Sequence, residues 1–320
     1  MKKLIVISGA TATGKTSFSL KIASLIKDEI QGLVKIINFD SLLFYKELNI
    51  GTAKPTLKER QGHEHLLIDI TSAKNPMNAH QFIQLAENEI NQCHKANIIP
   101  ILVGGSAFYL RALIKGMYES TSISEELRSK LDQDYKENGI TPFIDFLKKN
   151  DPTSIENLHE NDHYRIIRAV EHYKQTGKPL SEEKKRMDEL DPYDLSKAKN
   201  DWELHHIYLE LPREEHWSYI TRRTSQMISE GLVQEVKELL DNGFTGEEKP
   251  LQSIGYLETI SFLKGEFEDD SAYSERISIS TRQLAKSQRT FFKKITPKYT
   301  YHPIIDEEKL LRECKEFVLA

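Results

Sequence analysis

Short apolar runs alternate with amphipathic stretches in the first 118 residues. Residues 4–7 form an apolar run that ends at Gly9, and the apolar positions that follow lie on one face of a helix. Further strand-like runs occur at residues 34–39, 66–70 and 98–103, and a helix is predicted at residues 107–115. Strands that alternate with helices form right-handed βαβ units. This part therefore predicts an α/β fold with a parallel sheet.

Strand signals disappear between residues 119 and 201, where several helix starts follow one another. Acidic residues follow Ser124, and Thr141 and Asp151 are each followed by proline, which is favoured in the first turn of a helix. Another helix is predicted to begin after Asp162. Residues 182–201 are highly charged and are expected to form a mobile connection. We therefore predict two domains, a core of residues 1–118 and 202–320 and a helical insertion of residues 119–201.

The C-terminal third is predicted to return to the sheet and then to become helical. Residues 206–211 alternate between apolar and polar side chains, as a strand does. A long helix is expected from Pro212 towards Gly243, followed by helices near residues 256–264 and 271–294.

The strongest chemical signal is a glycine-rich segment between the first strand and the first helix. It fits the pattern G-x-x-x-x-G-K-[ST] and comprises Gly9, Ala10, Thr11, Ala12, Thr13, Gly14, Lys15 and Thr16. Backbone N–H groups of such a loop form an anion cradle, the lysine adds a positive charge, and the threonine hydroxyl can ligate Mg²⁺. The motif predicts a phosphate-binding loop (P-loop) for a diphosphate or a nucleotide such as ATP.

Two further polar groups follow predicted strands. Asp40 and Ser41 follow residues 34–39, and Gly104, Gly105 and Ser106 follow residues 98–103. Ligands of open parallel sheets bind outside the carboxyl ends of the strands. Asp40 could hold Mg²⁺, accept a proton or cap a helix, and Ser106 alone is better explained as a helix cap. We expect Asp69 to be structural.

The charge distribution is uneven along the chain. The net charge is −5, but residues 282–298 contain six Lys or Arg and no acid, which leaves −11 for the rest. Arg282, Lys286, Arg289 and Lys293 fall on one side of a helix, with Leu284 and Phe291 on the opposite, buried side. Such a stripe suits a polyanion and contacts phosphates without reading sequence.

Composition excludes several classes of protein. Only two cysteines occur, and they are far apart, which excludes a disulfide scaffold and a cysteine-rich zinc module. No apolar run reaches the ~18–20 residues of a membrane-spanning helix. The apolar segment near the N-terminus is too short for a secretory signal. We expect a cytoplasmic monomer.

Several longer motifs resemble the bacterial tRNA dimethylallyltransferase (tRNA isopentenyltransferase) family. They are GATATGKT at 9–16, DSLLFYKELNIGTAKP at 40–55, LVGGSAFYLRAL at 102–113, NDHYRIIRAVEHYKQTGKPLS at 161–181, PREEHW at 212–217, SIGYLE at 253–258 and TRQLAKSQRTFF at 281–292. The resemblance spans nearly the whole chain. It implies transfer of the dimethylallyl group from dimethylallyl diphosphate to N6 of the adenosine 3′-adjacent to the anticodon, adenosine 37 of tRNA.

The resemblance also implies roles for individual residues. The P-loop would hold the diphosphate with Mg²⁺, bound in part by Thr16, and Asp40 would be the general base. Ser106, Arg128 and Arg223 would act on the reacting groups. Contacts to tRNA would come from Asp40, Ser41, Leu42, Leu43, Ser106, Arg128, Tyr164, Arg165, Ile166, Ile167, Arg168, Gln252, Ser253, Ile254, Gly255, Tyr256, Leu257, Arg282, Lys286, Arg289 and Lys293.

The chain departs from the family where Tyr219, Ser287 and Leu257 replace basic residues, and where Phe291 replaces tryptophan. Fewer cations predict weaker, more salt-sensitive tRNA binding. Three alternatives stay open. An adenylate isopentenyltransferase would need neither the insertion nor the basic helix. A P-loop kinase of a small metabolite would turn over ATP, and an RNA-binding nucleotide switch would lack a base aimed at the phosphate site.

Overall fold

The computed structural model describes residues 2–117, 124–189, 191–196 and 198–320. They form two compact units, one of Met1–Lys115 with Tyr193–Ala320 and one of Gly116–Pro192. The sequence places the insertion at 119–201, whereas residues 193–201 belong to the first unit.

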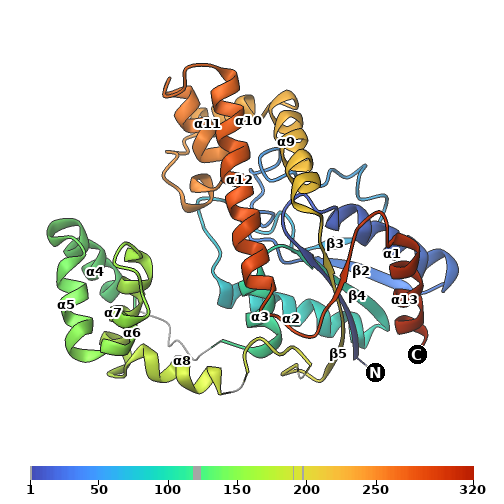
Figure 1. Ribbon diagram of the computed structural model, residues 1–320, viewed down its shortest axis with the longest axis horizontal. Coiled ribbons are helices and arrows are strands. Elements are labelled where there is room, and N and C mark those ends of the chain that lie inside the picture. Colours follow the sequence, from blue (N-terminus) through green and yellow to red (C-terminus); the bar gives the residue numbers. More distant parts are fainter. Residues whose placement is uncertain (1, 118–123, 190, 197) are drawn as a thin grey trace. The chain divides into compact units, whose positions relative to one another are not determined.

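The first unit is built on a parallel sheet of six strands (Figure 1). The strands are β1 (Lys2–Gly9), β2 (Leu33–Asn38), β3 (His65–Leu66), β4 (Ile98–Gly104), β5 (Trp202–Leu209) and β6 (Tyr299–Tyr301), in the spatial order β3-β2-β4-β1-β5-β6. All neighbouring pairs are parallel, which confirms the predicted sheet. Its central strand β1 is buried almost throughout, as expected of a sheet covered on both faces.

Helices cover both faces of this sheet. Helices α1 (Lys15–Glu29) and α13 (Glu307–Leu319) lie on one face, and α2 (Ala79–Lys95) and α3 (Ala107–Lys115) on the other (Figure 1). The sequence analysis missed α2, α13 and β6. Helix α2 nevertheless carries a usable signal, because Asn78 and Gln81 form a capping box at its start.

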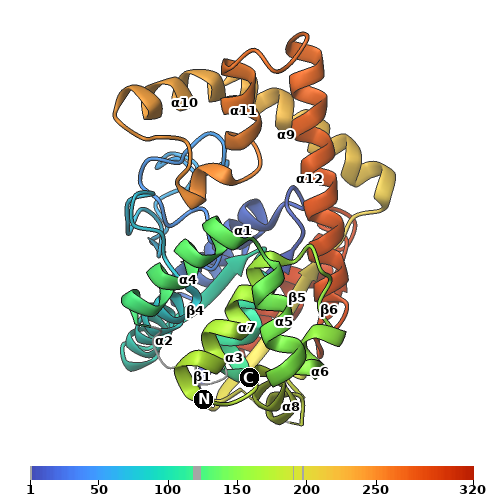
Figure 2. The ribbon, with the colours of Figure 1, turned by 90° about the vertical axis from the view of Figure 1, so that its left-hand side faces the viewer.

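The remaining helices of the first unit follow β5. They are α9 (Arg213–Ser229), α10 (Leu232–Asp241), the 3₁₀-helix η1 (Lys249–Gln252), α11 (Tyr256–Leu263) and α12 (Asp270–Phe292), whose colours run from gold to red-orange in Figure 2. They share a hydrophobic cluster with Tyr45 and Leu48, which follow β2, and with Ala73, which follows β3. The prediction of one long helix from residue 212 is wrong, because Gly231 adopts a left-handed φ of 105° and separates α9 from α10.

The second unit is helical, as predicted. It contains α4 (Glu125–Asn138), α5 (Thr141–Asn150), α6 (Pro152–Glu156), α7 (His163–Thr176) and α8 (Leu180–Asp188) around a small core of its own. Helices α4 and α7 begin after Ser124 and Asp162, whose side chains accept the expected capping hydrogen bonds. The expectation of a mobile connection is wrong for residues 182–188, since α8 occupies them and Asp151 accepts from Ser181.

Among the residues that the structure describes, no helix combines the length and the apolar character needed to cross a membrane.

Candidate active site

A cavity of about 240 Å³ opens in the first unit at the carboxyl ends of β1, β2 and β4. The lining combines the phosphate-loop residues Thr11, Ala12, Gly14, Lys15 and Thr16 with Asp40, Leu43, Gly104 and Arg223. Its remaining wall includes apolar side chains such as Ile36, Ile68 and Val103. The structure thus brings the predicted phosphate cradle, the predicted base and a predicted arginine around one volume.

The P-loop is shaped by hydrogen bonds to its own backbone. Lys15 Nζ donates to the Ala10 carbonyl at 2.7 Å, and Thr13 Oγ1 donates to the same oxygen at 2.9 Å. Thr16 is exposed in the first turn of α1 and lines the cavity. The unpaired N–H groups of that turn favour an anion, so the helix start points the cradle at the cavity.

Three charged side chains influence one another at the cavity. Burial lowers the pKa of Lys15 to about 8, an effect that the nearby Asp40 opposes and the nearby Arg223 reinforces. Burial likewise lowers the pKa of Arg223, with Asp40 acting in the opposite direction. Two cations held close together beside one carboxylate form a site that favours a further anion.

Asp40 is fixed by Asn38, which the sequence analysis did not single out. The buried Asn38 amide accepts from Asp40 N–H at 2.8 Å and donates to the carbonyls of Asp40 and Leu67, each at 2.9 Å. Asp40 Oδ1 in turn accepts from Leu42 N–H at 3.2 Å. A buried asparagine whose amide is used this fully holds the turn after β2 rigidly.

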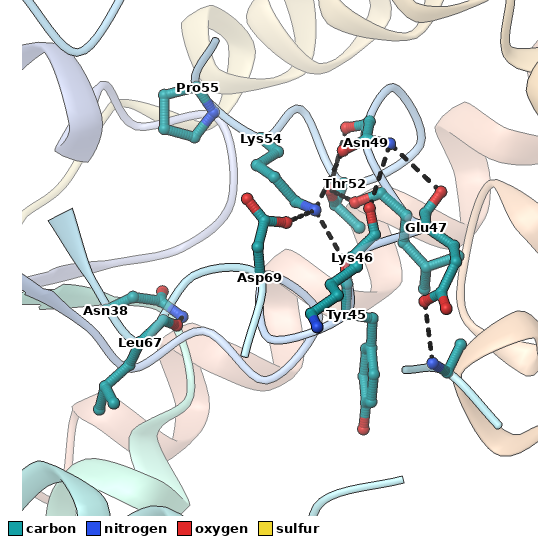
Figure 3. A network of polar contacts seen from close by, with 12 residues as sticks. Asn38, Tyr45, Lys46, Glu47, Asn49, Thr52, Lys54, Pro55, Leu67 and Asp69 are labelled. Atoms are coloured by element: carbon teal, nitrogen blue, oxygen red, sulfur yellow. Dashed lines mark hydrogen bonds and ion pairs between the residues drawn. The ribbon is translucent and has the colours of Figure 1, made fainter. Parts of the chain in front are cut away.

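One wall of the cavity is anchored by Lys54 (Figure 3). Its buried ammonium donates to Tyr45 O, Asn49 Oδ1 and Asp69 Oδ1 at 2.7, 3.0 and 2.5 Å. Asp69 is therefore structural, as predicted. Thr52, Ala53 and Pro55, which flank Lys54, line the cavity.

This wall also holds Arg223. The Arg223 guanidinium donates to Thr52 O at 3.1 Å. The segment before Thr52 is held by Glu235 of α10, whose carboxylate accepts from the backbone N–H groups of residues 49, 50 and 51 at 2.8–3.2 Å. Glu235, like Lys54 and Thr52, was missed, because its partners are backbone groups nearly 190 positions away.

The predicted residues near the strand ends differ in their access to the cavity. Leu43 lines it, and Ser41 and Leu42 are half-buried in the same turn. Ser106 precedes α3 and is half-buried, and its carbonyl accepts from Leu110 N–H at 3.1 Å. Gly104, the last residue of β4, lines the cavity, whereas Gly105 and Ser106 are not among its lining residues.

Other residues that were predicted to contact substrate lie in the second unit. Arg128 and Arg168 both face the buried carboxylate of Glu171, at 3.8 and 2.5 Å, and Arg165 pairs with Asp162 at 2.9 Å. Tyr164 is exposed and Ile167 packs on the hydrophobic core of this unit. The Ile166 side chain is fully buried in that core, and its contact with tRNA stays a prediction.

Residues 252–257, which were predicted to contact tRNA, differ in their exposure to solvent. Gln252 and Leu257 are exposed and Ser253 and Ile254 are half-buried, whereas Gly255 and Tyr256 are buried. The Tyr256 side chain is enclosed and its hydroxyl donates to Glu235 at 2.6 Å, whereas its contact with tRNA stays a prediction. Tyr256 therefore supports the carboxylate that holds residues 49–51.

The basic helix α12 presents its cations unequally. Lys286 and Lys293 are exposed and Arg289 is half-buried. Arg282 is tied to α9, since it donates to Thr221 at 3.0 Å, lies over the Trp217 ring and pairs with Glu275 on its own helix. The predicted buried stripe is wrong by one position, because Ala285 and Phe292 are buried, whereas Leu284 is 40% exposed.

Comparison with known proteins decides the family. The model of the IPP transferase family matches residues 43–295. The chain belongs to the IPP transferase family. A curated IPP transferase relative, tRNA dimethylallyltransferase 2 of Geotalea daltonii, is 36% identical over 91% of this chain and 85% of its own. The tRNA dimethylallyltransferase of Acetivibrio thermocellus is 34% identical over 99% of this chain and 98% of its own.

Solved IPP transferase structures share the architecture. The full-length tRNA isopentenylpyrophosphate transferase of Bacillus halodurans aligns over 100% of this chain and 96% of its own, with a TM-score of 0.69 and 30% identity. A eukaryotic dimethylallyltransferase studied in the act of modifying tRNA aligns over 100% of this chain and 80% of its own, with a TM-score of 0.79 and 25% identity. The sequence-based recognition of the family and of its P-loop-like fold is confirmed.

Proposed function

We propose that this protein is a prenyltransferase that moves the dimethylallyl group from dimethylallyl diphosphate to N6 of adenosine 37 in tRNA. One observation carries the proposal. In a chain that belongs to the IPP transferase family, a phosphate cradle, a carboxylate and two cations surround a single cavity. The products are N6-dimethylallyladenosine in tRNA and inorganic diphosphate.

The P-loop end of the cavity would receive the diphosphate. Backbone N–H groups at the start of α1, the Lys15 ammonium and the Arg223 guanidinium place positive charge where the leaving group gains negative charge. The apolar wall with Ile36, Ile68 and Val103 suits the five-carbon chain. Closing this volume around the donor would also exclude water, which otherwise competes for an allylic cation.

The oxygen donors at the cavity fit Mg²⁺. The Thr16 hydroxyl and the Asp40 carboxylate both line it, and oxygen ligands are those that Mg²⁺ prefers. When bound, Mg²⁺ would supply charge neutralisation to the departing diphosphate. Asp40 and Thr16 would hold it, which gives Asp40 a second possible task.

Asp40 would accept the proton from N6. The lone pair of this amine is delocalised into the adenine ring, so the amine needs a base as the new C–N bond forms. In the step, N6 attacks the allylic carbon, the C–O bond to diphosphate breaks with its electron pair, and the N6 proton passes to Asp40. The turn held by Asn38 keeps the carboxylate at the cavity.

The tRNA would be held outside this cavity. The exposed cations Lys286 and Lys293 of α12 suit phosphates, as do the exposed arginines of the second unit. Adenosine 37 is stacked in the anticodon loop and must be flipped out, at a cost of a few kcal/mol that such contacts offset.

A labelled-donor experiment tests the proposal. The protein is incubated with Mg²⁺ and labelled dimethylallyl diphosphate together with tRNA, AMP or ATP in separate reactions. Label is expected in tRNA at adenosine 37 and not in the free nucleotides. Label in AMP or ATP would identify the alternative, an adenylate isopentenyltransferase. ATP hydrolysis without label transfer would identify a kinase or a nucleotide switch.

A further inference from the structure

Thr11 of the P-loop is held by two side chains from distant helices. Its N–H donates to Gln288 Oε1 at 2.9 Å, and its carbonyl accepts from His216 Nε2 at 2.7 Å. Gln288 belongs to α12 and His216 to α9, 277 and 205 positions away along the chain. Both backbone polar groups of Thr11 are thus satisfied by side chains that do not belong to the nucleotide-binding motif.

The next residue shows why such support is needed. Ala12 has a left-handed φ of 61°, a conformation that is unfavourable for a residue with a β-carbon. Strained backbone of this kind persists where its surroundings over-determine it. Thr11 and Ala12 both line the cavity, so the supported stretch is part of the surface offered to a ligand.

The other end of the Gln288 amide reaches a second edge of the site. Its Nε2 donates to Gly105 O at 3.1 Å. A β-carbon at Gly105 would lie 2.7 Å from that nitrogen, so only glycine leaves room for the amide. One glutamine therefore connects the loop after β1 to the turn after β4.

His216 is fixed as a neutral donor. It is 1% exposed, and burial lowers its pKa, as do the neighbouring charges of Arg289 and Lys15, while Thr11 O and Glu210 act in the opposite direction. A carbonyl oxygen can only accept a hydrogen bond, so Nε2 of the ring carries the hydrogen. His216 thus adds no charge of its own to the phosphate site.

We propose that Gln288 and His216 are positioning residues of the donor site, which hold Thr11 and Ala12 in the shape that receives the diphosphate. The inference rests on the proposed role of the cavity as the diphosphate site. Gln288 lies on α12 between Lys286 and Arg289, so the helix that offers cations to tRNA also braces the phosphate cradle.

A matched pair of variants tests Gln288. Gln288→Met removes both hydrogen bonds at nearly constant volume, whereas Gln283→Met makes the same change at an exposed position of α12. The dissociation constants for dimethylallyl diphosphate and inorganic diphosphate are measured by titration calorimetry with Mg²⁺, and that for tRNA by filter binding. For Gln288→Met we expect about tenfold weaker binding of both diphosphates, as the loss of a hydrogen-bonding pair implies, with tRNA affinity and melting temperature near wild type. Gln283→Met should match wild type.

A second pair tests His216 and guards against a misfolded Gln288 variant. His216→Gln retains a donor towards Thr11 O, and His216→Leu removes it. We expect weakened diphosphate binding for His216→Leu and substantial recovery for His216→Gln. Combined with Gln288→Met, His216→Leu should show a non-additive loss, because both partners act on Thr11.

Two outcomes overturn the inference. One is a folded Gln288→Met protein that binds both diphosphates as tightly as wild type, and the other is equal affinity of the two His216 variants. Wild-type protein that binds inorganic diphosphate but not dimethylallyl diphosphate would instead contradict the proposed function. The inorganic diphosphate measurements would still decide the positioning role in that case.

Discussion

Charged side chains are arranged in opposite ways in the donor cavity and in the helical unit. At the cavity, Lys15, Arg223 and Asp40 come from three separate segments and converge on one volume. In the helical unit, Arg165 pairs with Asp162, and Arg128 and Arg168 share Glu171. The first arrangement places charges around a cavity, whereas the second pairs each arginine with a neighbouring acid.

Under the proposed function, this difference favours the first unit as the one that performs the chemistry. Converging charges in a partly enclosed volume stabilise developing charge strongly, because little water screens them. The pairs of the helical unit involve exposed arginines, with Arg128 and Arg165 54% and 69% exposed. The exposed Arg165–Asp162 pair contributes little to stability, so under the proposed function Arg165 would turn to a phosphate of a bound RNA at small cost, whereas Arg128 also faces the buried carboxylate of Glu171.

The largest effect is expected from removing the helical unit. Replacing residues 117–192 by a short Gly/Ser linker should abolish tRNA modification and leave binding of dimethylallyl diphosphate within a few-fold of wild type. The physical reason is that the helical unit has a hydrophobic core of its own, separate from the hydrophobic clusters of the first unit. The cavity is lined by residues of the first unit, so its lining is kept when the helical unit is removed.

Calorimetry with the donor and a tRNA-labelling assay on the same protein check this prediction. Circular dichroism before and after heating serves as the control for folding of the shortened chain. Normal tRNA modification by a folded, shortened protein would remove the helical unit from the function.

The next largest effect concerns the carboxylate of the cavity. Asp40→Asn keeps the shape and loses the base, so kcat should fall by roughly 10²–10⁴-fold while both substrates still bind. The loss should not ease at any accessible pH. Glu59→Gln, an exposed change outside the cavity, is the control. A near wild-type kcat for Asp40→Asn would eliminate the general base, and recovery in excess Mg²⁺ would reassign Asp40 to metal binding.

A smaller effect is expected from the cation beside it. Lys15→Ala should weaken dimethylallyl diphosphate binding by roughly tenfold to a hundredfold, the range for hydrogen bonds to charged groups. With a pKa lowered to about 8, the free protein's Lys15 is charged below that pH and neutral above it. Donor affinity of the wild type should therefore fall as the pH rises through about 8, and that of Lys15→Ala should stay flat. A flat profile for wild type would show that Lys15 contributes no charge to binding.

Sequence reasoning found the parts of the molecule whose partners are local. The P-loop, Asp40 after β2 and the capped starts of α4 and α7 are visible because the residues that define each pattern lie within a few positions of one another. Gln288, His216 and Glu235 were missed because each acts on backbone groups more than 180 positions away. Such contacts leave no spacing pattern.

Helical periodicity failed in an instructive place. On α12 the pattern predicts that Leu284 is buried. In the structure the small Ala285 packs against Ile220 of α9, and Gln288 contacts the P-loop. Burial there is set by a hydrogen bond and by close packing of small side chains, and hydrophobicity alone does not register either.

The smallest effect is expected from the cations of α12, which test whether exposed charges outside the cavity bind tRNA. Lys286→Glu with Arg289→Glu should raise the KM for tRNA about tenfold at low salt, while binding of dimethylallyl diphosphate changes far less. Arg282 is left intact, because its contacts with Thr221 and the Trp217 ring hold α12 to α9. The difference from wild type should shrink as salt rises, because released counterions account for the affinity.

Lys27→Glu with Lys95→Glu, at exposed positions of α1 and α2, is the matched control for net charge. If that control raised the KM equally, the effect would come from overall charge and α12 would not be a tRNA-binding surface.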